Sequence, residues 1–348
     1  MKKHLVAIAA LAAMFAASAS AQTLPKTHLK VVGGLSNLTA YNDYEKPFWT
    51  NVVPTLSNGQ VTADIKGFNE MGLKGPEILR LMSQGVIEFG TATLSYFASD
   101  NPINEAIDLA GLTSDAKGAR AVVEAFEPIY VKHYGPGSGI KVLGISPYPA
   151  QVLFCNAEIK GLSDIKGKKV RTSSRTQAEF IEALGGSSVT MAFGEVVPAM
   201  QNKVVDCAIT GSLSGYSAKW YEVATHLYAL PINWNSQIHG VNQKAWNKID
   251  PKVQEFLQTN IKAMVNNMWD AAAAQTQQGY DCNTGSDACP LSVKGKMVLV
   301  EPSDTDRAQL KKIMQEQVLP KWAARCSASC VKDFNATISK VVGLTAKK

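Results

Sequence analysis

The stretch "GPEILRLMSQGVIEFGTATLSYF" covers residues 75–97, and a similar stretch, "GEVVPAMQNKVVDCAITGSLSGY", covers residues 194–216. The aligned positions are Glu77 with Glu195, Met82 with Met200, Val86-Ile87-Glu88 with Val204-Val205-Asp206 and, after a slip of one residue, Leu94-Ser95 with Leu213-Ser214. Each copy has apolar residues at helical spacing followed by a β-type run. The pair predicts one helix-strand step in each of two similar α/β lobes. A chance likeness between two helix-to-strand junctions is the alternative.

The rest of the chain also alternates strands with helices. Residues 27–35, 60–68, 140–156, 168–173 and 187–193 have strand patterns, and residues 42–57, 119–134 and 176–186 have helical ones. This order is typical of βαβ units and a mainly parallel sheet. We expect an N-terminal α/β lobe over residues 22–146 and the core of a second α/β lobe over residues 147–212. The chain is expected to cross between the lobes near Gly144 to Pro149 and again near Ala208 to Gly215.

Residues 213–348 are expected to form a hinge-crossing segment followed by long C-terminal helices that pack on both lobes. Asp250 and Pro251 precede a long helical pattern that continues to about Tyr280. Aspartate is a favoured N-cap and proline is favoured at the first helical position, so the helix is expected to begin there. A further helical pattern covers residues 305–326.

The N-terminus has the three parts of a secretory signal peptide. Lys2 and Lys3 precede an apolar run from Leu5 to Ala17, and small residues surround Ala21. The run is shorter than the roughly 20 residues that a membrane span requires. We expect cleavage after Ala21, so that residues 1–21 are removed and the mature protein is periplasmic and not membrane-spanning.

Composition and charge limit the classes of partner. The chain has 348 residues, 46% hydrophobic and 18% charged, and is long enough for two domains. Removal of Lys2 and Lys3 reduces the formal charge of +6 to +4. No stripe of basic residues interleaves with aromatic residues, so nucleic acid is not an expected partner. A mild positive charge suits an anionic small molecule.

Six cysteines in an exported chain favour disulfides over free thiols. Cys282 and Cys289 bracket a turn-rich loop, and Cys326 and Cys330 bracket "SAS", so both pairs are expected to form local disulfides. A zinc site is the alternative, but neither pair has the two-residue gap of a zinc knuckle, and no metal site is predicted. Cys155 and Cys207 lie in apolar, strand-like runs, where a third disulfide and two buried free thiols are both open.

Motifs of catalysis are missing from the sequence. We find no HExxH, phosphate-binding lysine loop, GxSxG or kinase-like set. A nucleophile pair of Cys155 and His239 has no local support. No cofactor is predicted.

The sequence instead contains a group of residues suited to binding an anionic ligand. Arg171 ends the predicted strand "KKVR" and precedes Thr172, Ser173, Ser174 and Arg175. Open α/β sheets bind ligands at the carboxyl ends of their strands, and a guanidinium matches a carboxylate through two parallel hydrogen bonds. The alternative is an interdomain salt bridge, for example between Arg171 and Glu195.

Three segments make the chain resemble a known family. "GLSDIKGKKVRT", "SVTMAFGEVVPAMQNKVVDCAITG" and "THLYALPINW" resemble the solute-binding subunit of tripartite ATP-independent periplasmic (TRAP) transporters, in the DctP-like superfamily. The resemblance covers nearly the whole mature chain. It implies a two-lobed, type II-like periplasmic binding protein fold that closes over an organic acid and delivers it to membrane permease subunits.

The resemblance also implies roles for single residues. Arg171 would form a salt bridge to the ligand carboxylate, and Phe193 would pack against the ligand body. At the position of the family's frequent asparagine this chain has Thr210, whose hydroxyl offers one donor where an amide offers two. This change favours a ligand with an apolar or aromatic body over a small dicarboxylate. The remaining expected ligand contacts are Ser36, Asn37, Ser95 and Tyr96 in the first lobe, and Tyr148 and Trp234 near the lobe crossings, for which hinge or core packing is the alternative.

The predicted function is therefore capture of an organic acid anion for a TRAP permease. The competing hypothesis is an exported two-lobed enzyme that acts on a small carboxylic acid. An enzyme needs a base, a nucleophile or a metal at the site, whereas the sequence offers an arginine, hydroxyls and aromatic rings. We therefore predict that the protein is not an enzyme.

Overall fold

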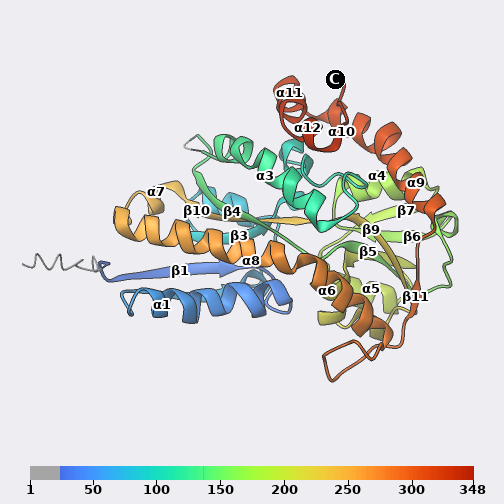
Figure 1. Cartoon of the computed structure of the whole chain (residues 1–348), viewed down its shortest axis with the longest axis horizontal. Coiled ribbons are helices and arrows are strands. Elements are labelled where there is room, and N and C mark those ends of the chain that lie inside the picture. The colour runs from blue at the N-terminus through green and yellow to red at the C-terminus, as the bar shows by residue number, and fades with distance from the viewer. Residues whose placement is uncertain (1–23, 136) are drawn as a thin grey trace, which may run out of the picture.

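The computed structural model describes residues 24–135 and 137–348, and the predicted signal peptide lies outside these residues. The described chain forms two β-sheets with helices around them (Figure 1). The first sheet has the order β2-β1-β3-β10-β4, with β1 Thr27–Gly33, β2 Val61–Gly67, β3 Phe89–Thr93, β4 Ile140–Pro147 and β10 Ser236–Asn242. The second has the order β11-β9-β5-β8-β6-β7, with β5 Gln151–Cys155, β6 Lys169–Thr172, β7 Ser187–Thr190, β8 Cys207–Gly211, β9 His226–Asn233 and β11 Val298–Val300.

The chain passes from the first sheet to the second between β4 and β5, as predicted, and returns between β9 and β10 at Trp234 and Asn235. The predicted crossing near Ala208 to Gly215 is wrong. In the structure β8 lies inside the second sheet between β5 and β6, and the chain continues in that lobe through β9. The strand pattern of residues 203–211 does not reveal this, because a strand that ends at a hinge and one that ends at a loop have the same periodicity.

Each sheet contains one strand that runs against its neighbours. β10 is antiparallel to β3 and β4, and β5 is antiparallel to β8 and β9, whereas β1, β2 and β3 run parallel and so do β6, β7 and β8. β5 and β10 are the strands that follow the two crossings. They start at the hinge and run away from it, while their neighbours end there. The carboxyl ends of most strands in both lobes therefore face the junction between the lobes.

The two copies of the repeat lie in different lobes, as predicted. The first copy forms α2 (Ile78–Ser83) and β3, and the second forms α5 (Val196–Gln201) and β8. In both copies the helix buries its apolar face, which includes Met82 in α2 and Met200 in α5. The repeated sequence thus specifies the same step from a packed helix to a strand that ends at the junction.

The remaining helices surround the two sheets. In the first lobe they are α1 (Val53–Leu56), α3 (Ala116–His133) and α7 (Gln243–Trp246). In the second lobe they are α4 (Arg175–Ala183) and α6 (Ser212–Ser217). The C-terminal helices are α9 (Asp304–Ile313), α10 (Leu319–Arg325), α11 (Ala328–Ala336) and α12 (Ile338–Val342).

The long helix α8 (Pro251–Thr284) joins the two lobes along one side (Figure 1). The Asp250 carboxylate accepts a hydrogen bond from the Lys252 N–H, with Pro251 at the first position, which confirms the predicted start of the helix. α8 packs on β4 of the first lobe and on α6 of the second. At Gly279 a Cβ would lie 2.3 Å from the backbone nitrogen of Leu213, so only glycine allows α6 to pack this closely.

Candidate functional site

A small cavity lies where the two lobes meet. It has a volume of about 20 Å³, which is room for about one water molecule. The lining residues come from both lobes and from both crossings: Leu35, Leu38, Thr93, Tyr96, Tyr148, Gln151, Arg171, Ser173, Phe193, Thr210, Ser214 and Asn235. The lobes are therefore closed around the site, and a larger ligand requires them to separate.

The two copies of the repeat supply corresponding parts of the lining. Thr93 is the last residue of β3 and Tyr96 follows that strand, while Thr210 lies near the carboxyl end of β8 and Ser214 follows it. Each copy turns from its strand directly into a short helical segment, which is a 3-10 turn (Leu94–Phe97) in the first copy and α6 in the second. The repeat therefore brings hydroxyl groups from opposite lobes to one site.

Arg171 is the charged side chain of the cavity. It lies on β6 between β7 and β8 and is 1% exposed. Its Nε and Nη2 donate to the Met191 carbonyl oxygen at 3.2 and 3.0 Å, and its Nη1 donates to the Ile209 carbonyl oxygen at 2.8 Å. A guanidinium has five N–H groups, so one N–H on each terminal nitrogen is left for another acceptor. The neighbouring strands thus hold the guanidinium in one orientation.

No carboxylate of the described residues lies within 4.0 Å of the Arg171 nitrogens. Burial, the largest effect, lowers the pKa of Arg171, while the neighbouring Tyr96 hydroxyl and the more distant Glu195 raise it. The structure has no salt bridge between Arg171 and Glu195, so the alternative expected from the sequence is wrong. Glu195 instead accepts from Lys74 of the other lobe at 2.9 Å, at an exposed position. Arg171 is therefore a buried cation without a counter-ion among the described residues, which is costly unless an anion joins it.

One wall of the cavity is apolar and aromatic. Phe193 stacks on Trp220 with their ring centroids 5.4 Å apart and an interplanar angle of 24°. Leu35 and Leu38, which follow β1, line the cavity from the first lobe. Phe193 and both leucines are largely buried. Their side chains offer a ligand dispersion contacts and no hydrogen bonds.

Asn235 links the lobes at the second crossing. Its Nδ2 donates to the Gln151 Oε1 at 3.2 Å and to the Ser173 Oγ at 3.0 Å, both in the second lobe. Its Oδ1 accepts from the Ser95 hydroxyl of the first lobe at 3.3 Å, and its carbonyl oxygen accepts from the Tyr148 N–H at 3.0 Å. The two crossings are thus hydrogen-bonded to each other beside the cavity.

A buried carboxylate supports this crossing from behind. Asp108 accepts from the backbone N–H groups of Trp234 and Asn235 at 2.8 and 2.9 Å and from the Asn233 Nδ2 at 2.8 Å. Burial raises the pKa of Asp108 to about 7, against the lowering effect of these donors. Asn235 has a positive φ of 46°, and the backbone bonds to Asp108 and Tyr148 hold it in this conformation.

The structure brings five of the nine predicted ligand contacts to the cavity, namely Arg171, Phe193, Thr210, Tyr148 and Tyr96. The other four lie elsewhere. Ser36 bonds the Asn69 side chain, and Asn37 is exposed on the turn after β1. Ser95 donates to Asn235, and Trp234 is a buried hinge residue whose indole N–H has no partner in the described residues. The turn after β1 instead directs Leu35 and Leu38 to the cavity.

Seven of the lining residues are not among the predicted ligand contacts, although Ser173 belongs to the hydroxyl-rich segment noted after Arg171: Leu35, Leu38, Thr93, Gln151, Ser173, Ser214 and Asn235. The repeat carried a signal for Ser214, because its aligned partner Ser95 was itself a candidate. Gln151 and Asn235 are placed by the antiparallel strands that start at the hinge, and no local pattern marked those starts.

The cysteine alternatives are also decided. The structure forms disulfides between Cys282 and Cys289, between Cys326 and Cys330, and between Cys155 and Cys207, which face each other across β5 and β8. Because Cys155 is bonded in the second lobe and His239 lies on β10 of the first, they do not form a nucleophile pair. Among the described residues no cluster of three or more His, Cys, Asp or Glu side chains has a metal-binding arrangement.

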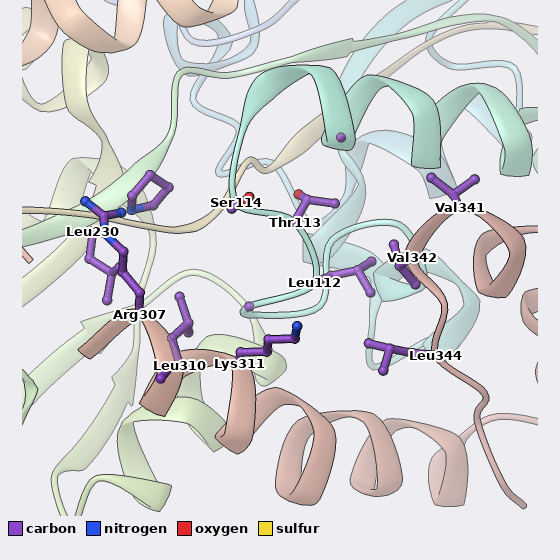
Figure 2. A pocket seen from close by; sticks show the side chains of 14 residues that line it. Leu112, Thr113, Ser114, Leu230, Arg307, Leu310, Lys311, Val341, Val342 and Leu344 are labelled. Atoms are coloured by element: carbon purple, nitrogen blue, oxygen red, sulfur yellow. The ribbon is translucent and has the colours of Figure 1, made fainter. Parts of the chain in front are cut away.

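A larger groove lies away from this cavity (Figure 2). It has a volume of about 490 Å³ and runs between α9, the segment before α3, and the end of α12 with Leu344 after it. Figure 2 shows Arg307 and Lys311 on one side and Val342 and Leu344 on the other. The Arg307 and Lys311 side chains are exposed on α9. Unlike Arg171, neither is held in one orientation by hydrogen bonds to strand carbonyl groups. The small cavity, with its buried charge, is the stronger candidate for a specific site.

No helix within residues 24–135 and 137–348 combines the length and apolar character needed to cross a membrane.

The sequence is similar to that of known proteins. A relative in Escherichia coli strain K12, the 2,3-diketo-L-gulonate-binding periplasmic protein YiaO, is 23% identical over 199 residues, which is 57% of this chain and 61% of that protein. The match thus spans less than two thirds of that relative's length.

Solved structures are similar over nearly their whole length. DctP7 of Bordetella pertussis, an extracytoplasmic solute receptor binding pyroglutamic acid, has a TM-score of 0.79 and 18% identity, covering 89% of this chain and 98% of its own. A TRAP periplasmic solute-binding protein of Desulfovibrio salexigens, with bound orotic acid, has a TM-score of 0.78 and 18% identity, covering 90% and 99%. These likenesses confirm the two-lobed fold. A model of the bacterial extracellular solute-binding proteins of family 7, the DctP family, matches residues 37–324, and the chain belongs to that family.

Proposed function

We propose that the protein is the solute-binding subunit of a TRAP transporter, that it captures an organic acid anion between its lobes, and that it delivers the anion to membrane permease subunits. Residues 1–21 act as a signal peptide, so the mature protein works in the periplasm. The protein releases its ligand chemically unchanged and is not an enzyme. Membership of an extracellular solute-binding family supports this proposal.

One observation carries the proposal. Arg171 is buried between the lobes, its orientation is fixed by carbonyl groups, and no carboxylate of the described chain lies within 4.0 Å of its nitrogens. A buried cation of this kind needs an anion, and a carboxylate matches the two remaining N–H groups. The similar proteins named above, which bind pyroglutamic and orotic acid, support an organic acid as that anion.

Four further lining residues complete the proposed ligand site around Arg171. Phe193 packs against the body of the ligand, and Tyr96, Tyr148 and Thr210 present hydroxyl groups to it. Ser36, Asn37, Ser95 and Trp234, which the sequence also suggested, are not included as direct contacts. Ser95 supports the site indirectly, because its hydroxyl donates a hydrogen bond to Asn235 at the second crossing.

Titration calorimetry on Arg171→Ala tests the proposal. The substitution leaves the ligand carboxylate unpaired in a buried site, and losses of this kind cost about 2 to 5 kcal/mol, or roughly 30-fold to several-thousand-fold in affinity. Arg171→Lys should recover part of the loss, because an ammonium carries the charge without the planar fork. Arg175→Ala is the matched control, since Arg175 is a neighbouring but exposed arginine. Equal affinity of wild type and Arg171→Ala would contradict the proposal.

The competing function, an enzyme acting on a small carboxylic acid, has its own test. Wild-type protein is incubated with each acid that binds it, and the acid is then recovered and analysed by mass spectrometry. We expect the unchanged acid at full recovery. Time-dependent conversion that requires the folded protein would favour the enzyme.

A further inference from the structure

We infer that the site admits a ligand with a single carboxylate and an uncharged body, and that it rejects dicarboxylates. The inference rests on the proposed function and specifies the net charge of the ligand. It follows from the distribution of charged and polar groups around the cavity.

The cavity offers one positive charge. Arg171 is the sole cation among the lining residues, whose other members are neutral. Lys74, a cation of the facing lobe, does not line the cavity, and its ammonium is bound to Glu195 at 2.9 Å. A ligand with two carboxylates would therefore have no cation for the second.

The groups behind the lining make a second negative charge less favourable still. Glu45 lies beneath the turn after β1, where its carboxylate accepts from the Gly34 N–H at 3.0 Å. Asp108 lies behind the second crossing, beneath Asn235. Both side chains are buried and acidic. A second ligand carboxylate would meet neutral or negative surroundings on these two sides.

The guanidinium itself is matched to one carboxylate. Its three hydrogen bonds to the carbonyl oxygens of Met191 and Ile209 leave one N–H on each terminal nitrogen. Two N–H groups accommodate the two oxygens of a single carboxylate. From the first lobe, the Tyr96 phenol lies against the Arg171 guanidinium.

The neutral amides of the lining are already engaged. Asn235 donates to Gln151 and Ser173, and Gln151 donates to the Pro149 carbonyl oxygen at 3.0 Å. These amides hold the crossings together and are poor candidates for a second carboxylate. Leu35, Leu38 and the Phe193 ring form the rest of the wall and suit an uncharged body.

The energetic consequence is selectivity against a second charge. An ionised carboxylate that is buried without a partner loses its hydration and gains no compensating contact. Specificity of this kind comes from the penalty to the wrong ligand and not only from contacts to the right one. A penalty of 1.4 kcal/mol already corresponds to tenfold in affinity. We therefore expect dicarboxylates to bind at least about tenfold more weakly than matched monocarboxylates.

Matched pairs of acids test the inference by calorimetry at pH 7.5. The protein is purified after export and freed of bound solute by unfolding and refolding. The pairs are succinamate with succinate, glutaramate with glutarate, and benzoate with phthalate, so that each pair differs mainly by one carboxylate. Arg171→Ala is titrated with the same acids.

We expect the monoanion of each binding pair to bind at least about tenfold more tightly than the dianion, and we expect this binding to be lost in Arg171→Ala. A dianion that binds as tightly as its monoanionic partner, with loss in Arg171→Ala, would overturn the inference while leaving the proposed function intact. Absence of binding by every acid, or binding that Arg171→Ala retains, would overturn the proposed function itself.

Discussion

Glu45 is a carboxyl group in the interior of the first lobe. It is fully buried, its Oε2 accepts from the Gly34 N–H, and its Oε1 has no partner among the described residues. Burial raises the pKa of Glu45 from the ordinary 4.5 to about 7, while the Gly34 and Thr91 hydrogen bonds oppose the rise. Between these two pH values the folded state retains a proton that the unfolded state releases. The free energy of unfolding therefore falls as the pH rises from 4.5 to 7.

The substitution Glu45→Gln should remove this dependence. Glutamine keeps an acceptor for the Gly34 N–H and stays uncharged, so we expect it to raise the free energy of unfolding at pH 8 by up to roughly 3 kcal/mol and to leave it nearly unchanged at pH 4. Urea denaturation at both pH values measures this, with Glu255→Gln on the exposed side of α8 as the control. The same pH dependence in Glu45→Gln and wild type would contradict the assignment.

Single residues of the site differ in how far the sequence predicts them. Arg171 could be predicted, because a strand-end arginine followed by hydroxyl residues is a local pattern. Its buried state, and the lack of a counter-ion within the part of the chain that the structure describes, could not be predicted, because they depend on Met191, Ile209 and Lys74 from separate segments. The position of Ser36 after β1 predicts a ligand contact. In the structure, Ser36 is hydrogen-bonded to Asn69, and the turn directs Leu35 to the cavity instead. Side-chain direction in a turn depends on its conformation, which residue type alone does not fix.

At the scale of elements, the Cys155–Cys207 disulfide joins β5 and β8 in the centre of the second sheet. Its sequence separation is 52 residues, compared with 7 for Cys282–Cys289 and 4 for Cys326–Cys330. A cross-link restricts the unfolded chain more when it closes a longer loop. The chain-entropy estimate is about 4 kcal/mol for the first bond, about 2.5 for the second and about 2 for the third.

Replacing each pair by alanine tests this order. We expect the Cys155→Ala/Cys207→Ala protein to lose the most stability in urea denaturation, since it also loses two buried sulfurs from the core. The Cys326→Ala/Cys330→Ala protein should lose the least and serves as the matched reference. A smaller loss for the Cys155 and Cys207 pair than for either short loop would contradict the estimate.

Elements with a local signal were predicted well. The start of α8 at Pro251 follows from its cap, and the two repeat copies fold as the same step in different lobes. The position of the second crossing and the reversed direction of β5 and β10 were not predicted, because they depend on which strands pair. Pairing is decided by contacts between segments far apart in the chain, such as Gln237 with Thr93 and Ser146. Periodicity within one segment carries no information on its neighbours.

At the scale of the whole molecule, several contacts join the lobes in the closed arrangement. Lys74 pairs with Glu195 at the surface, and Arg325 on α10 bonds both Glu105 of the first lobe and Glu179 of the second. The exposed Lys74 pair contributes little, about 0 to 1 kcal/mol, and is screened by salt. The Arg325 contacts are of a different kind, because Glu105 and Glu179 are both buried. The proposed anion at Arg171 would add to these contacts by binding the closed arrangement more tightly than the open one.

A crystal structure of the mature protein with a bound monocarboxylate is the most direct test of the central claim, which is that Arg171 holds an organic acid between the lobes. The acid is the tightest binder found by calorimetry. We expect its carboxylate within hydrogen-bonding distance of both Nη1 and Nη2 of Arg171, with its body against Phe193. An acid bound elsewhere, for example in the groove of Figure 2 beside Arg307, with no acid at Arg171, would contradict the claim.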